Sequence, residues 1–328
     1  MRGVQGRDAC FDASVREGVC EAMCLRMTIG DAMGEILADE KGGVADTAAV
    51  GAASAGTAGA GTALVLEGGG YRGVFTAGVL DVLMEKGMTG FDSVWGTSAG
   101  ALNAVTFRAR QIGRYIRVVL AFRDDSRMMS VMSLAKTGSI AGNDFLYHEV
   151  QERLDPLDVE TFNLGTTPVW ACATDVTFGT PAYLPIRRMP DDMDKIIASA
   201  SLPMLSEIVE VDGRRYLDGG TADSVPVETA LGLEGFARPE GAGGPASHAL
   251  VVLTQPRDYR KESAGALMPV ARRQYANKPY YLEALETRPE RYNAQRERIF
   301  SLEKQGRVTV VAPPEPLGIP TTGGSGEV

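Results

Sequence analysis

Two glycine-rich segments constrain this chain more than any other feature, because each stands between a short apolar run and a run with helical character. Residues 68–73 read Gly-Gly-Gly-Tyr-Arg-Gly, and residues 96–100 read Gly-Thr-Ser-Ala-Gly. The apolar runs 63–66 and 93–95 stand just before them. A strand that turns sharply through glycine into a helix is a building unit of α/β folds, and such turns gather at the carboxyl ends of the strands.

The rest of the chain continues this alternation of apolar and helical runs. We expect strands at 63–66, 93–95, 169–174, 249–254 and 308–311, and helices at 74–86, 99–110 and 290–305. The helix at 74–86 is mostly apolar, with a narrow polar stripe at Asp81 and Glu85. Asp212-Gly213 is a strong type I′ turn signal inside a hairpin at 209–217. Fully apolar strands separated by helices predict a three-layer α/β/α fold with a mostly parallel central sheet.

Composition divides the chain into three predicted parts. Residues 1–62 lack sustained periodicity and end in an Ala, Gly, Ser and Thr stretch, which predicts a flexible N-terminal extension. Residues 63–312 have the size of one α/β domain. Residues 313–328 contain Pro-Pro and Gly-Gly but no apolar run, which predicts a loose C-terminal tail.

Charge and cysteine content exclude several classes of protein. A net charge of −9 disfavours nonspecific nucleic-acid binding, so no nucleic-acid partner is expected. No secretory signal is visible, and residues 47–66 are too weakly apolar to favour spanning a membrane. The four cysteines are scattered, which argues against a disulfide scaffold or a metal site and suits the cytoplasm. Peripheral contact with the inner membrane face stays open.

Ser98 is the predicted nucleophile. It lies at the centre of a G-x-S-x-G turn, where Gly96 and Gly100 remove the Cβ atoms that would collide as strand and helix pass closely. The helix that follows directs its positive N-terminal end toward developing negative charge.

The first glycine segment predicts an oxyanion hole. Gly68, Gly69, Gly70 and Gly73 let the backbone curl with its N–H groups pointing inward, while Arg72 would anchor the loop or meet an anionic substrate group. The same glycines fit a dinucleotide-binding fingerprint. That alternative needs an acidic residue at the carboxyl end of the next strand, but Asp92 stands at its amino end.

The catalytic base is predicted to be Asp218 rather than a histidine. His148 falls in a predicted helix, and His248 precedes a strand at the amino edge of the sheet. Asp218 ends an apolar strand, and Gly219 and Gly220 allow a tight turn beside the serine. A carboxylate can act directly on a serine when it is well aligned and its pKa is raised by partial burial.

In order and spacing, the three motifs resemble those of the patatin-like phospholipase family, most of all its small bacterial members. The motifs are residues 68–73, 96–100 and 218–220, and Ala-Ser-Ala-Ser-Leu-Pro at 198–203 adds to the likeness. The resemblance covers roughly residues 63–312. It implies a patatin-like acyl-hydrolase domain, a Ser98–Asp218 dyad, an oxyanion hole in the glycine loop, lipid acyl-ester hydrolysis and no metal or other cofactor.

Two alternatives to a phospholipase or lysophospholipase remain at this point: an acyltransferase on the same scaffold, and a noncatalytic lipid- or nucleotide-binding module. A cluster of basic and aromatic residues also allows transient contact with a membrane surface, although an ordinary solvated surface explains the same pattern. Its members are Arg272, Arg273, Tyr275, Lys278, Tyr280 and Tyr281.

Overall fold

The computed structural model describes residues 61–128, 138–140, 142–263, 265 and 268–319. The predicted N-terminal extension lies almost entirely outside these residues. Within the predicted tail, Leu317 and Ile319 pack against the main hydrophobic core. The three-part division of the chain stays a prediction.

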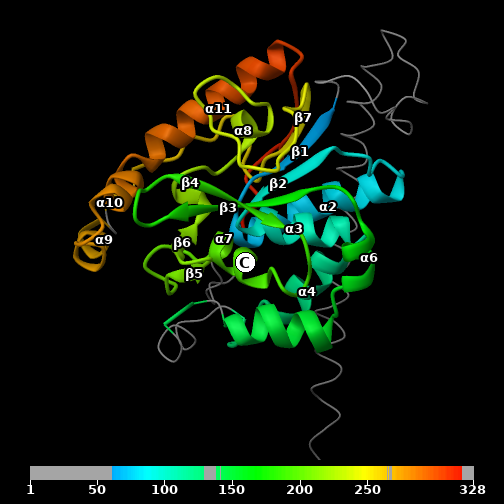
Figure 1. The fold of residues 1–328 in the computed structure, drawn as a ribbon, viewed down its shortest axis with the longest axis horizontal. Helices are drawn as coiled ribbons and strands as arrows, with labels where there is room; N and C mark the ends of the chain where they lie inside the picture. Colours follow the sequence, from blue (N-terminus) through cyan, green and yellow to red (C-terminus); the bar gives the residue numbers. More distant parts are fainter. Residues whose placement is uncertain (1–60, 129–137, 141, 264, 266–267, 320–328) are drawn as a thin grey trace, which may run out of the picture.

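An eight-stranded sheet forms the middle layer (Figure 1). The strands are β1 Thr62–Leu66, β2 Ser93–Thr97, β3 Val169–Asp175, β4 Pro181–Ile186, β5 Val209–Val211, β6 Arg214–Asp218, β7 His248–Val252 and β8 Val308–Val311. The order is β5-β6-β3-β2-β1-β7-β8, and β4 also pairs with β3. Strands β1, β2, β3, β7 and β8 pair in parallel, which confirms the predicted, mostly parallel α/β fold.

Helices cover both faces of the sheet. They are α2 Gly73–Glu85, α3 Ala99–Arg108, α4 Arg114–Phe122, α6 Val159–Leu164, α7 Met193–Ala200, α8 Val227–Ala230, α9 Met268–Gln274, α10 Pro279–Glu286 and α11 Arg288–Lys304, with a π-helix η4 at Asp144–Leu154. Short 3₁₀ turns lie at η3 Gly70–Arg72 and η5 Gly219–Thr221. Helices α2, α3, α4, η4 and α7 contribute to the core on one face, and α8 and α11 to the core on the other.

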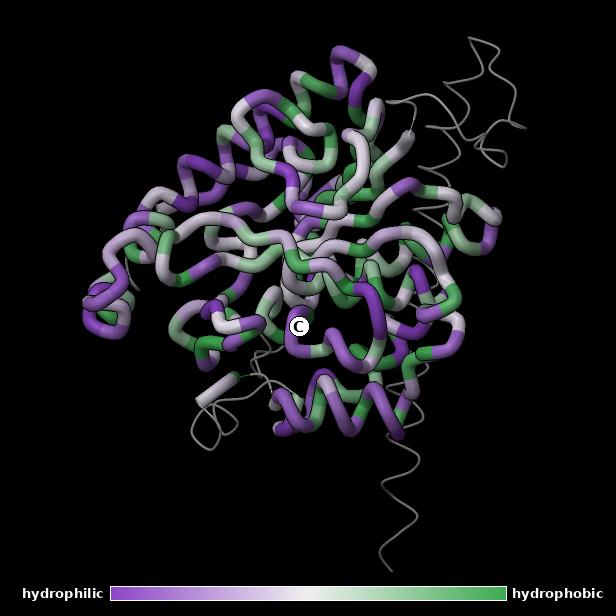
Figure 2. Tube along the Cα trace, in the orientation of Figure 1, coloured by the Kyte–Doolittle hydropathy of each residue, from purple (hydrophilic) through white to green (hydrophobic). Residues whose placement is uncertain are grey.

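Successive strand residues point to opposite faces, as the pleat requires. In β1, Leu64 and Leu66 join the core of the first face, while Ala63 and Val65 join that of the second. Helix α11 is mostly hydrophilic (Figure 2) and contacts the second face only through a narrow buried stripe that includes Ile299.

Strand β3 brings two distant chain segments together, because three strands pair with it. β2 pairs with residues 169–172 and β4 with residues 169–174, so β2 and β4 lie on opposite edges of β3. β6 pairs with residues 173–175, which overlap those on the β4 edge, so β6 lies on the same edge as β2. β2 ends with Thr97 opposite Cys172, and the antiparallel β6 ends with Asp218 opposite Ala173. The two strand ends therefore meet on one edge of β3.

The predicted hairpin is confirmed, and two further details differ from expectation. Asp212 and Gly213 have φ values of 50° and 73°, as a type I′ turn requires. Asp81, predicted to lie on a polar stripe of its helix, is buried and accepts the Gly113 N–H at 2.8 Å. Strand β4 was not predicted, because prolines at positions 181 and 185 argue against a strand.

Candidate active site

Ser98 occupies a strained turn between β2 and α3. Its φ and ψ are 56° and −122°, a region that residues with a side chain rarely adopt. A Cβ at Gly96 would collide with the Gly100 carbonyl, and one at Gly100 would lie 2.5 Å from the Leu66 oxygen. The glycines at these two positions therefore permit the turn that the sequence predicted.

The segment that ends α7 connects the two halves of the site. The backbone N–H of Ser98 donates to Oγ of Ser199 at 2.9 Å, and this hydroxyl donates to the Cys172 carbonyl at 2.6 Å. The carbonyl of Ser201 accepts the N–H of Asp218 at 2.7 Å. The sequence had marked residues 198–203 only as part of a resemblance, and their supporting contacts are visible only in the fold.

Asp218 is 4% exposed and lies at the end of β6. Its Oδ1 accepts the Gly220 N–H at 2.7 Å, while Oδ2 has no hydrogen-bond partner among the described residues. Burial raises the pKa of the carboxyl, and the neighbouring Ser98 hydroxyl and Arg288 charge lower it by less. The carboxyl therefore has a raised pKa and one oxygen free to accept a proton, and it lies beside a serine hydroxyl.

The glycine loop lies against Ser98. A Cβ on Gly68 would stand 3.1 Å from that of Ser98. The N–H groups of Gly68, Arg72 and Gly73 are used by the fold, donating to the carbonyls of Ser224, Gly69 and Gly70. Within the part of the chain that the structure describes, no hydrogen bond engages the N–H of Gly69 or of Gly70.

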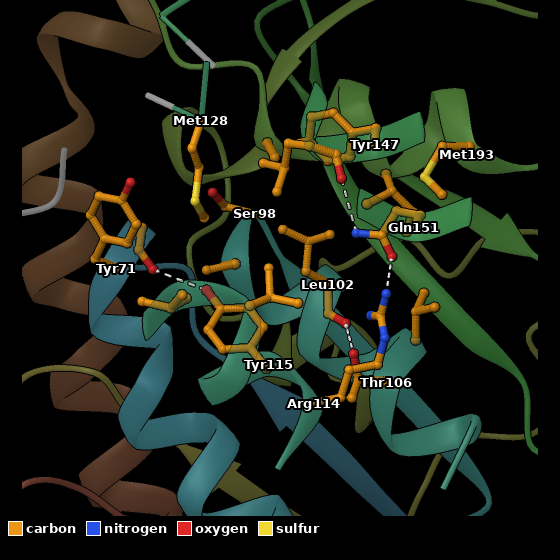
Figure 3. A pocket seen from close by; sticks show the side chains of 18 of the residues that line it. Tyr71, Ser98, Leu102, Thr106, Arg114, Tyr115, Met128, Tyr147, Gln151 and Met193 are labelled. Carbon is orange, nitrogen blue, oxygen red and sulfur yellow. Dashed lines mark hydrogen bonds between the residues drawn. The ribbon is translucent and has the colours of Figure 1, made fainter. Parts of the chain in front are cut away.

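An apolar pocket opens beside Ser98, between α3, α4, η4 and α7 (Figure 3). Leu102, Met193 and Ile196 are among its lining residues, and Ser98 stands on its wall with 7% of its surface exposed. Such a pocket suits a hydrocarbon chain, because its walls are largely aliphatic and aromatic.

Two cationic side chains lie near Asp218. Arg288, the first residue of α11, donates from Nε to the Gly220 carbonyl at 2.6 Å. Nζ of Lys261 lies 4.1 Å from the centre of the Tyr292 ring. Burial, with a smaller contribution from the charge of Arg288, lowers the pKa of Lys261 to about 7. Sequence reasoning missed both residues, because neither belongs to a motif and α11 reads as an ordinary charged helix.

The residues of the rejected alternatives lie away from the site. The ring nitrogens of His248 contact the Gly306 carbonyl and Thr309 Oγ1, at 3.2 and 3.0 Å. His148 is exposed beside Glu152, and Asp92 accepts the Thr62 N–H at the amino end of β1. Among the described residues, no group of three or more His, Cys, Asp or Glu side chains could hold a metal ion.

A family model described as "Patatin-like phospholipase" matches residues 64–231, more than half of the chain. This chain belongs to the patatin-like phospholipase family. A second model, a domain of unknown function (DUF6363), matches residues 278–327, which include α10 and α11. Membership of the patatin-like family supports a lipid hydrolase or an acyltransferase.

Similar proteins share the patatin-like region. The uncharacterized protein YjjU of Escherichia coli is 32% identical over 173 residues, 51% of this chain and 48% of its own. An uncharacterized NTE family protein, Rv1063c of Mycobacterium tuberculosis, is 26% identical over 52% of this chain and 46% of its own. Mouse 1-acylglycerol-3-phosphate O-acyltransferase Pnpla3 is 28% identical over 50% of this chain and 40% of its own. The chain thus spans less than half the length of these relatives.

Only part of the basic-aromatic cluster noted in the sequence is exposed: Arg272 and Arg273 lie at the surface, whereas two of its tyrosines are buried. Tyr275 and Tyr281 are 2% and 0% exposed, and their rings pack against each other beneath α9 and α10. Tyr280 is exposed. In the described residues, no helix is both long enough and apolar enough to cross a membrane.

Proposed function

We propose that this protein is a serine acyl hydrolase that cleaves lipid acyl esters, with Ser98 as nucleophile and Asp218 as proton acceptor. The observation that carries this proposal is the meeting of β2 and β6 on one edge of β3, which brings a strained serine next to a buried carboxylate. Membership of the patatin-like family supports the choice of lipid esters as substrates.

In the first step, Asp218 accepts the proton of Ser98 as Oγ attacks the acyl carbonyl. Oδ1 is held by Gly220, so Oδ2 takes the proton. The raised pKa of Asp218 makes it a stronger base than an exposed aspartate. The N-terminal end of α3 stabilises the negative charge that forms on the substrate.

The oxyanion is held by the backbone N–H groups of Gly69 and Gly70 in this proposal. Within the described residues no hydrogen bond engages these two N–H groups, whereas those of Gly68, Arg72 and Gly73 already have acceptors. Donors that are oriented before the reaction lower the barrier without reorganisation. In this proposal Gly68 does not bind the oxyanion, and its lack of a side chain lets the loop pack closely against Ser98. Arg72 contributes positive charge near Lys261 and so helps to lower the pKa of that lysine.

The tetrahedral intermediate then collapses: the ester C–O bond breaks, and protonated Asp218 gives its proton to the departing alcohol, which leaves the acyl-enzyme. In the second step, Asp218 takes a proton from water as the water attacks the acyl-enzyme, and it returns that proton to Oγ of Ser98 as the fatty acid leaves. Lipid esters are reached from a membrane or micelle surface. A cytoplasmic location with transient contact at the inner membrane face is therefore part of the proposal.

A fluorophosphonate probe and a fatty-acid release assay test this function together. Wild type should be labelled and should release fatty acid from phospholipid or lysophospholipid micelles, and Ser98→Ala should lose both properties. Ser301→Ala, at an exposed serine of α11, is the matched control and should behave as wild type. Labelling that persists in Ser98→Ala, or equal release by both proteins, would falsify the assignment.

Acyl transfer is a second candidate, because the mouse relative is named an acyltransferase. The same acyl-enzyme would then react with a lipid hydroxyl in place of water. Adding a lysophospholipid acceptor to the assay separates the two: diacyl product at the expense of free fatty acid indicates transfer. Lipid binding without turnover or probe labelling would instead indicate a noncatalytic module.

A further inference from the structure

The pocket beside Ser98 has a definite direction away from the serine. Leu102 and Thr106 of α3 line it, four and eight residues after Ser98, which caps the start of this helix, so the three lie along one side of it. With a rise of 1.5 Å per residue, the lining from Ser98 to Thr106 extends about 12 Å. Helix α7 runs the opposite way, with Met193 at the far end of the pocket and Ala200 near the serine.

The far end of the pocket is polar, unlike its walls. Arg114, at the start of α4, is 3% exposed and lines the pocket together with Gln151 of η4. Its Nη2 donates to Oε1 of Gln151 at 2.8 Å and to the carbonyl of Asp155 at 2.5 Å. Figure 3 shows Leu102 between Ser98 and this Arg114–Gln151 pair. The pocket thus begins at the serine and ends on a buried guanidinium.

The hydrogen bonds of Arg114 and Gln151 fix the two side chains in place, so they close the end of the pocket and do not bind a ligand there. Arg114 also donates from Nε to the Asp155 carbonyl at 3.2 Å, and this nitrogen lies 3.5 Å from the Asp155 carboxylate. The Gln151 amide donates to the Leu146 carbonyl at 3.1 Å. A hydrocarbon chain that pushed past the pair would break these buried bonds and could not replace them.

We propose that the Arg114–Gln151 pair sets an upper limit on the length of the acyl chain that this enzyme accepts. The inference rests on the proposed function, since it takes the pocket as the acyl site of Ser98. A carbon–carbon bond of about 1.5 Å advances an extended chain by roughly 1.25 Å, so the pocket holds roughly eight to ten carbons. Each methylene within that limit improves kcat/KM about threefold to fourfold by burial, and methylenes beyond it add nothing.

The test is a series of p-nitrophenyl esters from butyrate to palmitate. For wild type, kcat/KM should rise to the length that fills the pocket and then stay level or fall. Arg114→Met should move this limit to longer chains, because Asp155 keeps its contacts with Arg117 at 3.0 and 3.2 Å. Arg117→Met is the matched control: it removes the other arginine from the same carboxylate, lies outside the pocket and should leave the limit unchanged.

A second variant keeps the proposal testable if Arg114→Met does not fold. Leu102→Phe enlarges a side chain about halfway along the pocket and should move the limit to shorter chains. A wild-type optimum at palmitate, an unchanged limit in folded Arg114→Met, or an unchanged limit in Leu102→Phe would each overturn the proposal.

A measurement of fatty-acid binding tests the pocket assignment separately from the proposed hydrolase activity. In Ser98→Ala, displacement of a fluorescent fatty-acid probe by fatty acids from hexanoate to palmitate should show the same limit, and Arg114→Met should extend it. If wild type cleaves no ester but the binding limit is present and moves with Arg114, the hydrolase proposal fails and the pocket assignment stands. If esters are cleaved but neither measurement shows a limit that depends on Arg114, the pocket assignment fails alone.

Discussion

Ser199 holds the backbone of Ser98 in its strained conformation: its hydroxyl accepts a hydrogen bond from the Ser98 N–H at 2.9 Å and donates one to the Cys172 carbonyl at 2.6 Å. The serine of α7 thereby ties the turn after β2 to the neighbouring strand β3. Ser199 is fully buried, so no water replaces it when it is removed.

We therefore expect Ser199→Ala to impair both the turn and the reaction. Leaving a buried donor and a buried acceptor unpaired should cost about 1–3 kcal/mol of the free energy of unfolding. A displaced Oγ should lower kcat on an ester by roughly tenfold to a hundredfold, with a smaller change in KM. Urea unfolding and steady-state kinetics measure the two effects. Ser201→Ala, which removes only a hydroxyl bonded to Ile197 at the end of the helix, is the control and should retain most of its kcat.

Asp218→Asn separates catalysis from folding. Without a proton acceptor, turnover should fall by about a hundredfold to ten-thousandfold. Stability should change in the opposite direction. Because burial raises the pKa of Asp218 in the folded protein, its ionisation removes stability as pH rises through that pKa, so the neutral amide should raise the free energy of unfolding at pH 7. An Asn variant that is both active and less stable than wild type contradicts this assignment.

Lys261 should tune the base. Its positive charge lowers the pKa of Asp218, so Lys261→Met should shift the acid limb of the pH profile of kcat/KM to higher pH. The profile should be measured against Lys304→Met, which removes an exposed lysine from the end of α11. Equal acid limbs in the two variants would show that Lys261 does not act on Asp218.

Glu228 should make stability depend on pH near neutrality. Burial, and then the charge of Asp223, raise its pKa from 4.5 to about 7. The stability that the protonated form provides is fully present below pH 4.5 and is lost as pH rises through about 7. Glu228→Gln should therefore have the higher Tm above pH 7, with the gap closing toward pH 5. Glu234→Gln, at an exposed position, should show no such trend in the same thermal scans.

The sequence was sufficient for the parts of this site that local chemistry determines. Gly96 and Gly100 predict the turn at Ser98, because a Cβ at either position would meet backbone atoms. Asp212-Gly213 predicts the hairpin whose second strand ends in Asp218, since both residues adopt positive φ. The catalytic roles of Ser98 and Asp218 stay predictions until the variants are measured.

Long-range packing determines the parts that the sequence did not reveal. Tyr275 and Tyr281 seemed suited to a membrane surface, but they are buried against each other in a small core near β6. Lys261 and Arg288 reach the site only because the chain returns to it after β7. Neither kind of contact leaves a periodic or spaced pattern in the amino-acid sequence.

Because β2 and β6 pair with the same edge of β3, the hydrogen-bond register of these two strands determines how the nucleophile and the base are aligned. A slip of β6 by one residue would turn the Asp218 side chain to the opposite face of the sheet while leaving the hairpin intact. Extra residues at the hairpin tip, where a Cβ on Gly213 would meet nothing within 4 Å, leave that registry untouched. The tip at residues 212–213 is accordingly the place to insert an epitope or a fluorophore tag, whereas an insertion inside residues 214–218 would misalign the pair.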